Sequence, residues 1–165
     1  MAQAAPTVDA DTLGSARTLG RTRYEEDVYG WVQEQVALLR AGRLDALDLD
    51  HIAEELNDVG LSEYYRCQSA IEIVLLHMLK WDHQPERRSR SWTLSIAEHR
   101  ERIASVLRKS PGLKSSLAEA QEGAYRLARL RAAREMRRSA KSIPTDCPYA
   151  WDDILDRPFE LDADR

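Results

Sequence analysis

The sequence predicts an all-α fold: a helical bundle of four main helices with a short C-terminal capping helix. Apolar residues recur at spacings of three and four through long segments, and no segment alternates apolar and polar residues as a strand would. Only seven glycines and six prolines occur in 165 residues, so few residues interrupt a helix. Charged residues make up 32% of the chain, which suits amphipathic helices with solvated outer faces.

The first helix is predicted at 25–41, within "YEEDVYGWVQEQVALLRAG". Its opening "EED" places negative charge where the helix dipole favours it. One apolar face then runs from Val28 to Leu39. Arg40 in the last turn and Gly42 just beyond it are typical of a helix end.

The second helix is predicted at 49–80, with Asp48 as its N-cap. Gly60 lies inside this range and costs about 1 kcal/mol relative to alanine in a helix. The apolar stripe nevertheless keeps its phase from Leu56 to Tyr64, whereas a break would reset it. We therefore predict one long helix, with a possible kink at Gly60.

Two further helices are predicted at 91–109 and 112–138, separated by the stop "KSPG". The short capping helix is predicted in "PYAWDDIL". Each helix carries an apolar stripe, and these stripes together predict one core. Its expected members are Trp31, Ile71, Val74, Leu75, Ile96, Ile103 and Leu127.

The chain is predicted to have a disordered tail at 1–23 and a single helical domain at 24–165, because the tail has too little to bury. The tail lacks the continuous apolar run of a signal peptide, and no stretch approaches about 20 apolar residues. We therefore expect a cytoplasmic protein with no membrane partner. Two cysteines cannot form a disulfide framework, and Cys67 on an apolar stripe is interpreted as a buried, inert thiol.

The net charge of −4 hides a division along the chain. Residues 24–86 hold 14 acidic and 4 basic side chains, whereas residues 87–141 hold 5 acidic and 15 basic ones. Such a basic stretch can indicate nucleic-acid binding by the third and fourth helices. The structural interpretation is that basic and acidic helices lie side by side, so that their charges cancel within the fold.

The stretch "KWDHQPERRSRSW" joins the second and third predicted helices and contains the main candidate site. Its arginines could bind phosphate or carboxylate while its tryptophans stack on a ligand. The candidate partner- or anion-binding residues are Trp81, Arg87, Arg88, Arg90 and Trp92.

The structural alternative is that the tryptophans hold this turn in place and the arginines pair with acids of the second helix. A planar guanidinium bonds a carboxylate through two parallel hydrogen bonds, which favours such pairs. The expected acidic counterparts are Glu54, Glu55 and Asp58. The sequence leaves both interpretations open.

No metal site, cofactor or catalytic residue is predicted. His51 and Glu55 are one helical turn apart, but a two-metal site in a bundle needs a second such pair, which is absent. Cys147 could be activated by the helix that follows it, although a structural role is favoured. No phosphate-binding glycine loop or nucleophile elbow occurs.

Four stretches together resemble a known family: "YEEDVYGW", "LDLDHIAEELNDVG", "LLHMLKWDHQPERRSRSW" and "DCPYAWDDIL". In order and spacing they are similar to the bacterial domain-of-unknown-function family twenty-nine, over about residues 24–159. The resemblance implies an all-helical fold and no established activity.

Two hypotheses for function follow. The first is a non-enzymatic interaction module whose arginine- and tryptophan-rich turn meets another protein or an anionic partner. The second is a nucleic-acid-associated protein, either a nuclease or a toxin–antitoxin component. Salt dependence separates them, because neutralising phosphates makes nucleic-acid binding weaken steeply with salt.

Overall fold

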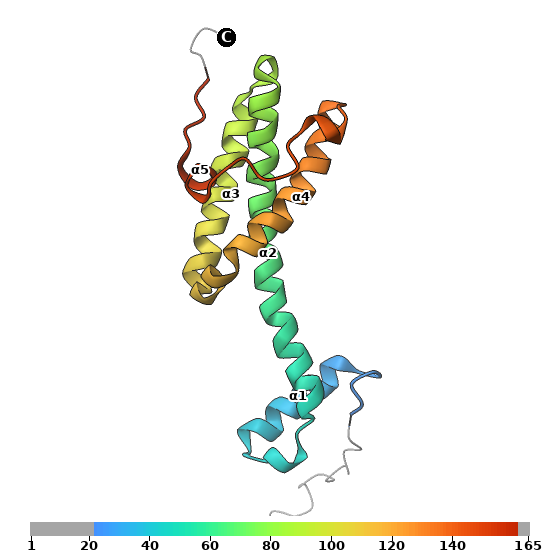
Figure 1. Ribbon diagram of the computed structural model, residues 1–165. Helices are drawn as coiled ribbons and strands as arrows, with labels where there is room; N and C mark the ends of the chain where they lie inside the picture. Colours follow the sequence, from blue (N-terminus) through green and yellow to red (C-terminus); the bar gives the residue numbers. More distant parts are fainter. Residues whose placement is uncertain (1–21, 162–165) are drawn as a thin grey trace, which may run out of the picture. The chain divides into compact units, whose positions relative to one another are not determined.

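The computed structural model describes residues 22–161 and contains helices without any strand in that range (Figure 1). The predicted all-α class is confirmed, since 78% of the described residues are helical. The helices are α1 (Val28–Arg40), α2 (Leu49–His83), α3 (Arg90–Lys109), α4 (Leu117–Met136) and the short α5 (Trp151–Asp156). Four 3-10 turns connect them: η1 (Leu44–Ala46), η2 (Pro85–Arg87), η3 (Pro111–Ser116) and η4 (Ala140–Ser142).

The backbone contacts divide the chain into two compact units, residues 1–55 and 56–165. The small unit holds α1 and the first turns of α2, and the large unit holds the rest of α2 with α3, α4 and α5. The predicted tail at 1–23 lies almost wholly outside the described residues. The single domain expected at 24–165 stays a prediction.

In the small unit, α1 begins at Val28 and not at residue 25, because Asp27 caps it. The carboxylate of Asp27 accepts a hydrogen bond from the Gly30 amide at 2.9 Å, which satisfies a donor that the helix itself cannot. The chain leaves α1 through Gly42, whose φ of +70° is favourable only for residues such as glycine.

Trp31 is buried in the small unit, with an exposed fraction of 3%. Its indole nitrogen donates to Asp48 at 3.2 Å. Gln35 beside it is equally buried, and its side-chain oxygen accepts from the Asp48 amide at 2.9 Å. The prediction that Trp31 belongs to the main core is therefore wrong, since that core lies in the large unit.

As predicted, α2 runs through Gly60 as one helix, but it ends at His83, just before Pro85, and not at residue 80. Every residue from 56 to 66 is exposed or half-buried, so this part of the helix packs little. Burial begins at Cys67, which is 1% exposed. Burial also raises the pKa of the Cys67 thiol, in agreement with its predicted role as an inert core residue.

The core of the large unit forms between α2, α3 and α4, with residues of the C-terminal segment added to it. Of the predicted core residues, those on α2 and α3 are confirmed. They are Ile71, Val74, Leu75, Ile96 and Ile103, each at most 1% exposed. From the C-terminal segment, Ile143, Tyr149 and Ile154 join the same cluster.

On α4 the prediction named the wrong face: Leu127 is 51% exposed. The buried face consists mainly of small residues: Ala120, Gly123, Ala124, Ala128, Ala132 and Ala133. A Cβ added at Gly123 would collide with the side-chain nitrogen of Gln68 on α2. Small side chains thus allow α4 to cross close to α2 (Figure 1), and the leucines of α4 are left outside.

Candidate functional site

The predicted turn between α2 and α3 is held by its own residues. Trp81 is 5% exposed. Arg88 donates from its Nε to the Trp81 carbonyl at 3.0 Å, and its guanidinium lies 4.9 Å from the centre of the indole ring. This arrangement combines a hydrogen bond with a cation–π contact on one arginine. Trp81 and Arg88 therefore stabilise the turn.

Trp92 has partners from α2. The ammonium of Lys80 lies 4.6 Å from the centre of its ring, and the ring of His77 lies 6.2 Å away. Burial, together with the charge of the neighbouring Lys80, lowers the pKa of His77 to about 4. His77 is thus neutral at physiological pH and belongs to the packing of this region.

Arg87 and Arg90 have exposed side chains, and within residues 22–161 neither forms a hydrogen bond or ion pair through its guanidinium. The structure does not bring them to the expected acids. Asp58 lies 23 positions before Trp81 on the same helix, which at 1.5 Å per residue is about 35 Å. Glu54 and Glu55 belong to the small unit.

Asp82, next to Trp81, is an acid of α2 that pairs with an arginine, the role expected of Glu54, Glu55 and Asp58. Its carboxylate accepts two hydrogen bonds from Arg157, at 2.6 and 2.9 Å, and one from the Tyr149 hydroxyl at 2.8 Å. Burial favours a higher pKa for Asp82, but the hydrogen bonds outweigh it and the pKa lies below its usual value. We call these three residues the C-terminal clamp.

Aromatic and cationic side chains extend the clamp. Phe159 meets the Trp81 ring edge-on at a centroid distance of 5.3 Å. The guanidinium groups of Arg100 and Arg157 lie 5.3 and 5.2 Å from the Phe159 ring. Arg100 also donates to three backbone carbonyls between residues 153 and 157. The C-terminal segment is thereby fixed against α2 and α3.

Several charges of the basic stretch are thus used within the fold. Arg129 donates to the carbonyls of Ile143 and Ala140 at 3.0 and 2.6 Å. Arg131 pairs with Glu72 of α2 at 3.6 Å. The expected pairing of basic and acidic helices therefore occurs in part, and backbone carbonyls take much of the remaining donor capacity.

Other basic side chains gather at one end of the large unit. Lys80 bonds Glu135 at 2.7 Å, which holds the end of α4 next to the end of α2 (Figure 1). The last turn of α4 and the α2–α3 turn thus lie at the same end of the unit. We call this surface the basic end. Besides Arg88, which bonds the turn itself, its exposed arginines are Arg87, Arg90, Arg134, Arg137 and Arg138.

A hollow of about 350 Å³ on α4 adjoins the basic end. It is lined by Leu127, Leu130, Arg131 and Arg134, with Glu72 from α2. The two leucines are 51% and 57% exposed. A helix face that exposes two leucines beside arginines is amphipathic. Exposed apolar side chains with a polar rim are typical of surfaces that bind another protein.

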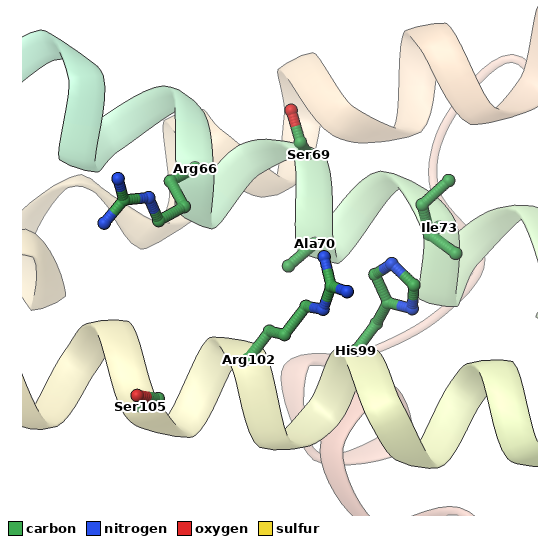
Figure 2. A pocket seen from close by; sticks show the side chains of 7 residues that line it. All are labelled: Arg66, Ser69, Ala70, Ile73, His99, Arg102 and Ser105. Carbon is green, nitrogen blue, oxygen red and sulfur yellow. The ribbon is translucent and has the colours of Figure 1, made fainter.

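A second hollow, of about 450 Å³, lies between α2 and α3 (Figure 2). From α2 it is lined by Arg66, Ser69, Ala70 and Ile73, and from α3 by His99, Arg102 and Ser105. Figure 2 shows Arg102 and His99 reaching from α3 toward α2. We call it the α2–α3 hollow.

In the small unit, His51 lies between acids. Its Nδ1 is 2.8 Å from the Asp48 carboxylate, and its Nε2 is 3.8 Å from Glu25. Tyr24 stacks on the imidazole at 4.3 Å between ring centres. The bond with Asp48 raises the pKa of His51, against the opposing effect of burial. The group ties the start of α2 to the segment before α1.

No cluster of three or more His, Cys, Asp or Glu side chains that could hold a metal ion was found between residues 22 and 161. No helix in the described part of the chain is both long and apolar enough to cross a membrane.

The chain matches a known protein family over most of its length. The model of the family described as "Domain of unknown function DUF29" matches residues 23–160. The chain belongs to this family. Neither the curated proteins nor the solved structures yielded a match. The matched range covers nearly all described residues of both units, including the small-unit group around His51 and the C-terminal clamp.

Sequence reasoning missed the residues that matter most in this arrangement. Asp82 and Tyr149 stand in two of the stretches that carry the resemblance, "LLHMLKWDHQPERRSRSW" and "DCPYAWDDIL", and Arg157 lies two residues after the second. That coincidence was the available signal. Arg66 and Arg102 gave no signal, because arginine on the solvated face of a helix is common. Only the packing of α2 against α3 brings them to one hollow.

Proposed function

We propose that this protein is a non-enzymatic interaction module whose large unit binds an acidic, amphipathic segment of another protein. The observation that supports this proposal is the exposed leucine pair of α4, Leu127 and Leu130, beside the arginines of the basic end. An acidic amphipathic helix offers apolar side chains for the leucines and carboxylates for the arginines.

Under this proposal the candidate residues of the turn have two roles: some contact the partner, and the others hold the turn in place. Arg87 and Arg90 contact the partner, because their guanidinium groups are exposed at the basic end. Trp81, Arg88 and Trp92 act indirectly by fixing the turn on which those two arginines stand. We also propose a cytoplasmic location for the protein, and cell fractionation tests it.

The leucines favour a protein partner over nucleic acid. Nucleic-acid affinity rests on phosphate contacts by Lys and Arg and gains little from an exposed aliphatic pair. A protein segment gains from both, since burying an exposed leucine side chain contributes about 1.5–3 kcal/mol. Electrostatic attraction then steers the acidic segment to the basic end.

A defined peptide tests the proposal. A fluorescent 20-residue amphipathic helix of leucine and glutamate is titrated with the full-length protein, and anisotropy reports binding. A duplex DNA of similar length is the second probe. We expect saturable peptide binding that weakens in Leu127→Ser and in Arg134→Gln. The matched controls are Leu94→Ser and Arg108→Gln, since both residues are exposed on α3 and outside the hollow.

Other outcomes are equally informative. Peptide binding that is unchanged in Leu127→Ser, or equally lost in Leu94→Ser, would overturn the proposed surface. DNA binding that falls steeply with salt and ignores the leucine substitutions would favour the nucleic-acid hypothesis instead. Light scattering on the protein alone shows whether a second copy occupies the surface, because the Leu127→Ser variant would then dissociate.

A further inference from the structure

The α2–α3 hollow has a lining that selects for negative charge. All of its polar side chains can donate hydrogen bonds, and no carboxylate is among the lining residues. Two of the donors are guanidinium groups, Arg66 from α2 and Arg102 from α3. Ala70 and Ile73 provide an apolar wall. We propose that this hollow binds a phosphomonoester, with the phosphate between the two arginines.

The arginines can be recruited to a ligand at little cost. Arg66 pairs with Glu63 at 2.8 Å and Arg102 pairs with Glu98 at 2.5 Å, each within its own helix. The arginine side chains remain 58% and 61% exposed. The Arg102–Glu98 pair is exposed on both sides and contributes little to stability, so a phosphate can replace Glu98 as the acceptor. Glu63 is only 27% exposed, and Arg66 keeps it as a partner while the remaining guanidinium donors of Arg66 serve the ligand.

His99 supplies a third ligand atom. Its Nδ1 lies 2.9 Å from the Ser95 carbonyl, which can only accept a hydrogen bond. The neutral ring therefore carries its proton on Nδ1, and Nε2 is the nitrogen left for a ligand. Nε2 accepts from a protonated phosphate oxygen, or donates to a phosphate oxygen when the imidazole carries both protons. Because His99 lies beside Arg102 in the hollow, its Nε2 resonance reports directly on occupancy (Figure 2).

The chemistry of the lining favours phosphate over other ligands. A metal cation finds no carboxylate there. A monocarboxylate offers one charge and two oxygens, whereas a phosphomonoester offers up to two charges and three terminal oxygens, enough for a fork from each helix. A hollow of about 450 Å³ also leaves room for the organic part of the ester, which Ile73 and Ala70 can cover.

The test uses the full-length protein with four probes at constant ionic strength: O-phosphoserine in a short peptide, glucose 6-phosphate, inorganic phosphate and acetate. Calorimetry gives the affinity, and ¹⁵N spectra of the imidazoles give the location. We expect His99 to shift with the phosphomonoesters, while His51 in the small unit does not. If the phosphopeptide binds more tightly than glucose 6-phosphate, the natural ligand is a phosphorylated protein. If glucose 6-phosphate binds more tightly, the natural ligand is a phosphorylated metabolite.

Variants complete the experiment. Arg66→Gln and Arg102→Gln should each weaken phosphomonoester binding about tenfold or more, the usual effect of losing a charge-assisted hydrogen bond. Glu98→Gln should tighten binding severalfold, because Arg102 loses its competing carboxylate. The control is Arg126→Gln on α4, since Arg126 is equally exposed and pairs with Glu122 within its helix.

Three results would overturn the proposal. The first is the lack of any His99 shift up to about 10 mM phosphomonoester. The second is equal weakening in Arg126→Gln and Arg102→Gln. The third is acetate binding as tightly as the phosphomonoesters. Glu98 lies on the exposed side of α3, so the Glu98→Gln substitution removes no core contact. Misfolding of this variant therefore does not obscure the outcome.

Discussion

Removing the Asp82 carboxylate should release the C-terminal clamp. In the Asp82→Ala variant, Arg157 loses two charge-assisted hydrogen bonds, and the hydroxyl of Tyr149, a residue only 8% exposed, loses its acceptor. Hydrogen bonds to charged groups contribute about 1.5–3 kcal/mol, and an unsatisfied buried donor costs about 1–3 kcal/mol. The ion pair is about one-third exposed, which reduces its share.

We therefore expect the free energy of unfolding to fall by about 2–4 kcal/mol in Asp82→Ala. For a unit of this size the melting temperature falls by roughly 10 °C. Urea denaturation followed by tryptophan fluorescence and by circular dichroism measures the change. Arg102→Gln is a control, since its exposed pair with Glu98 contributes less than about 1 kcal/mol.

A double-mutant cycle with Tyr149→Phe identifies the mechanism. If the two side chains act through their hydrogen bond, Tyr149→Phe costs less in the Asp82→Ala background than in the wild type. The folded-state pKa of Asp82 is lowered, so its contribution is complete above pH about 4 and disappears as the pH falls through that lower value. Additive costs, or a loss below about 0.5 kcal/mol in Asp82→Ala, would refute the clamp.

Three other predictions concern stability and are measured by the same denaturation assay. Leu75→Ala should lower the free energy of unfolding by about 2–5 kcal/mol because Leu75 is fully buried. Leu127→Ala should change it by less than about 0.5 kcal/mol because Leu127 is exposed. Equal losses in the two variants would contradict the exposed position of Leu127 on α4. Gly60→Ala should stabilise the protein by about 0.5–1 kcal/mol, since an added Cβ meets nothing within 4 Å in the middle of α2; a loss of stability would show that this residue has an unseen contact. Stability should decline from pH 6.5 toward pH 4, because the pKa of the half-buried His77 is lowered to about 4 and the unfolded state binds the extra proton. His77→Gln should flatten that slope, and an unchanged slope would assign the pH dependence to other groups.

The sequence by itself determined the all-α class and the existence and order of the helices. These features follow from local information: the spacing of apolar residues, the acidic residues that open the first helix, the stop at Gly42 and the break at Pro85. Helix ends differed by a few residues where a cap or a 3-10 turn intervened. On α2 and α3 the buried face was also correct, because large aliphatic residues mark it.

Only the tertiary structure decided which face of α4 is buried. Hydropathy assigns more weight to Leu127 than to Ala128, but a helix that crosses close to another needs small residues at the contact. The same limit applied to Trp31, whose apolar stripe could not show that it packs with Gln35 and Asp48 in a separate unit.

The partners of the charged side chains were likewise decided by the fold. The sequence placed an arginine-rich turn correctly, yet it could not show that Arg88 bonds a carbonyl or that Asp82 bonds Arg157, 75 residues later. A side chain on a solvated helix face has many possible partners along the chain, and its sequence neighbours do not distinguish them. Local spacing therefore determined the helices, whereas the clamp, the basic end and the α2–α3 hollow arise only when distant helices pack together.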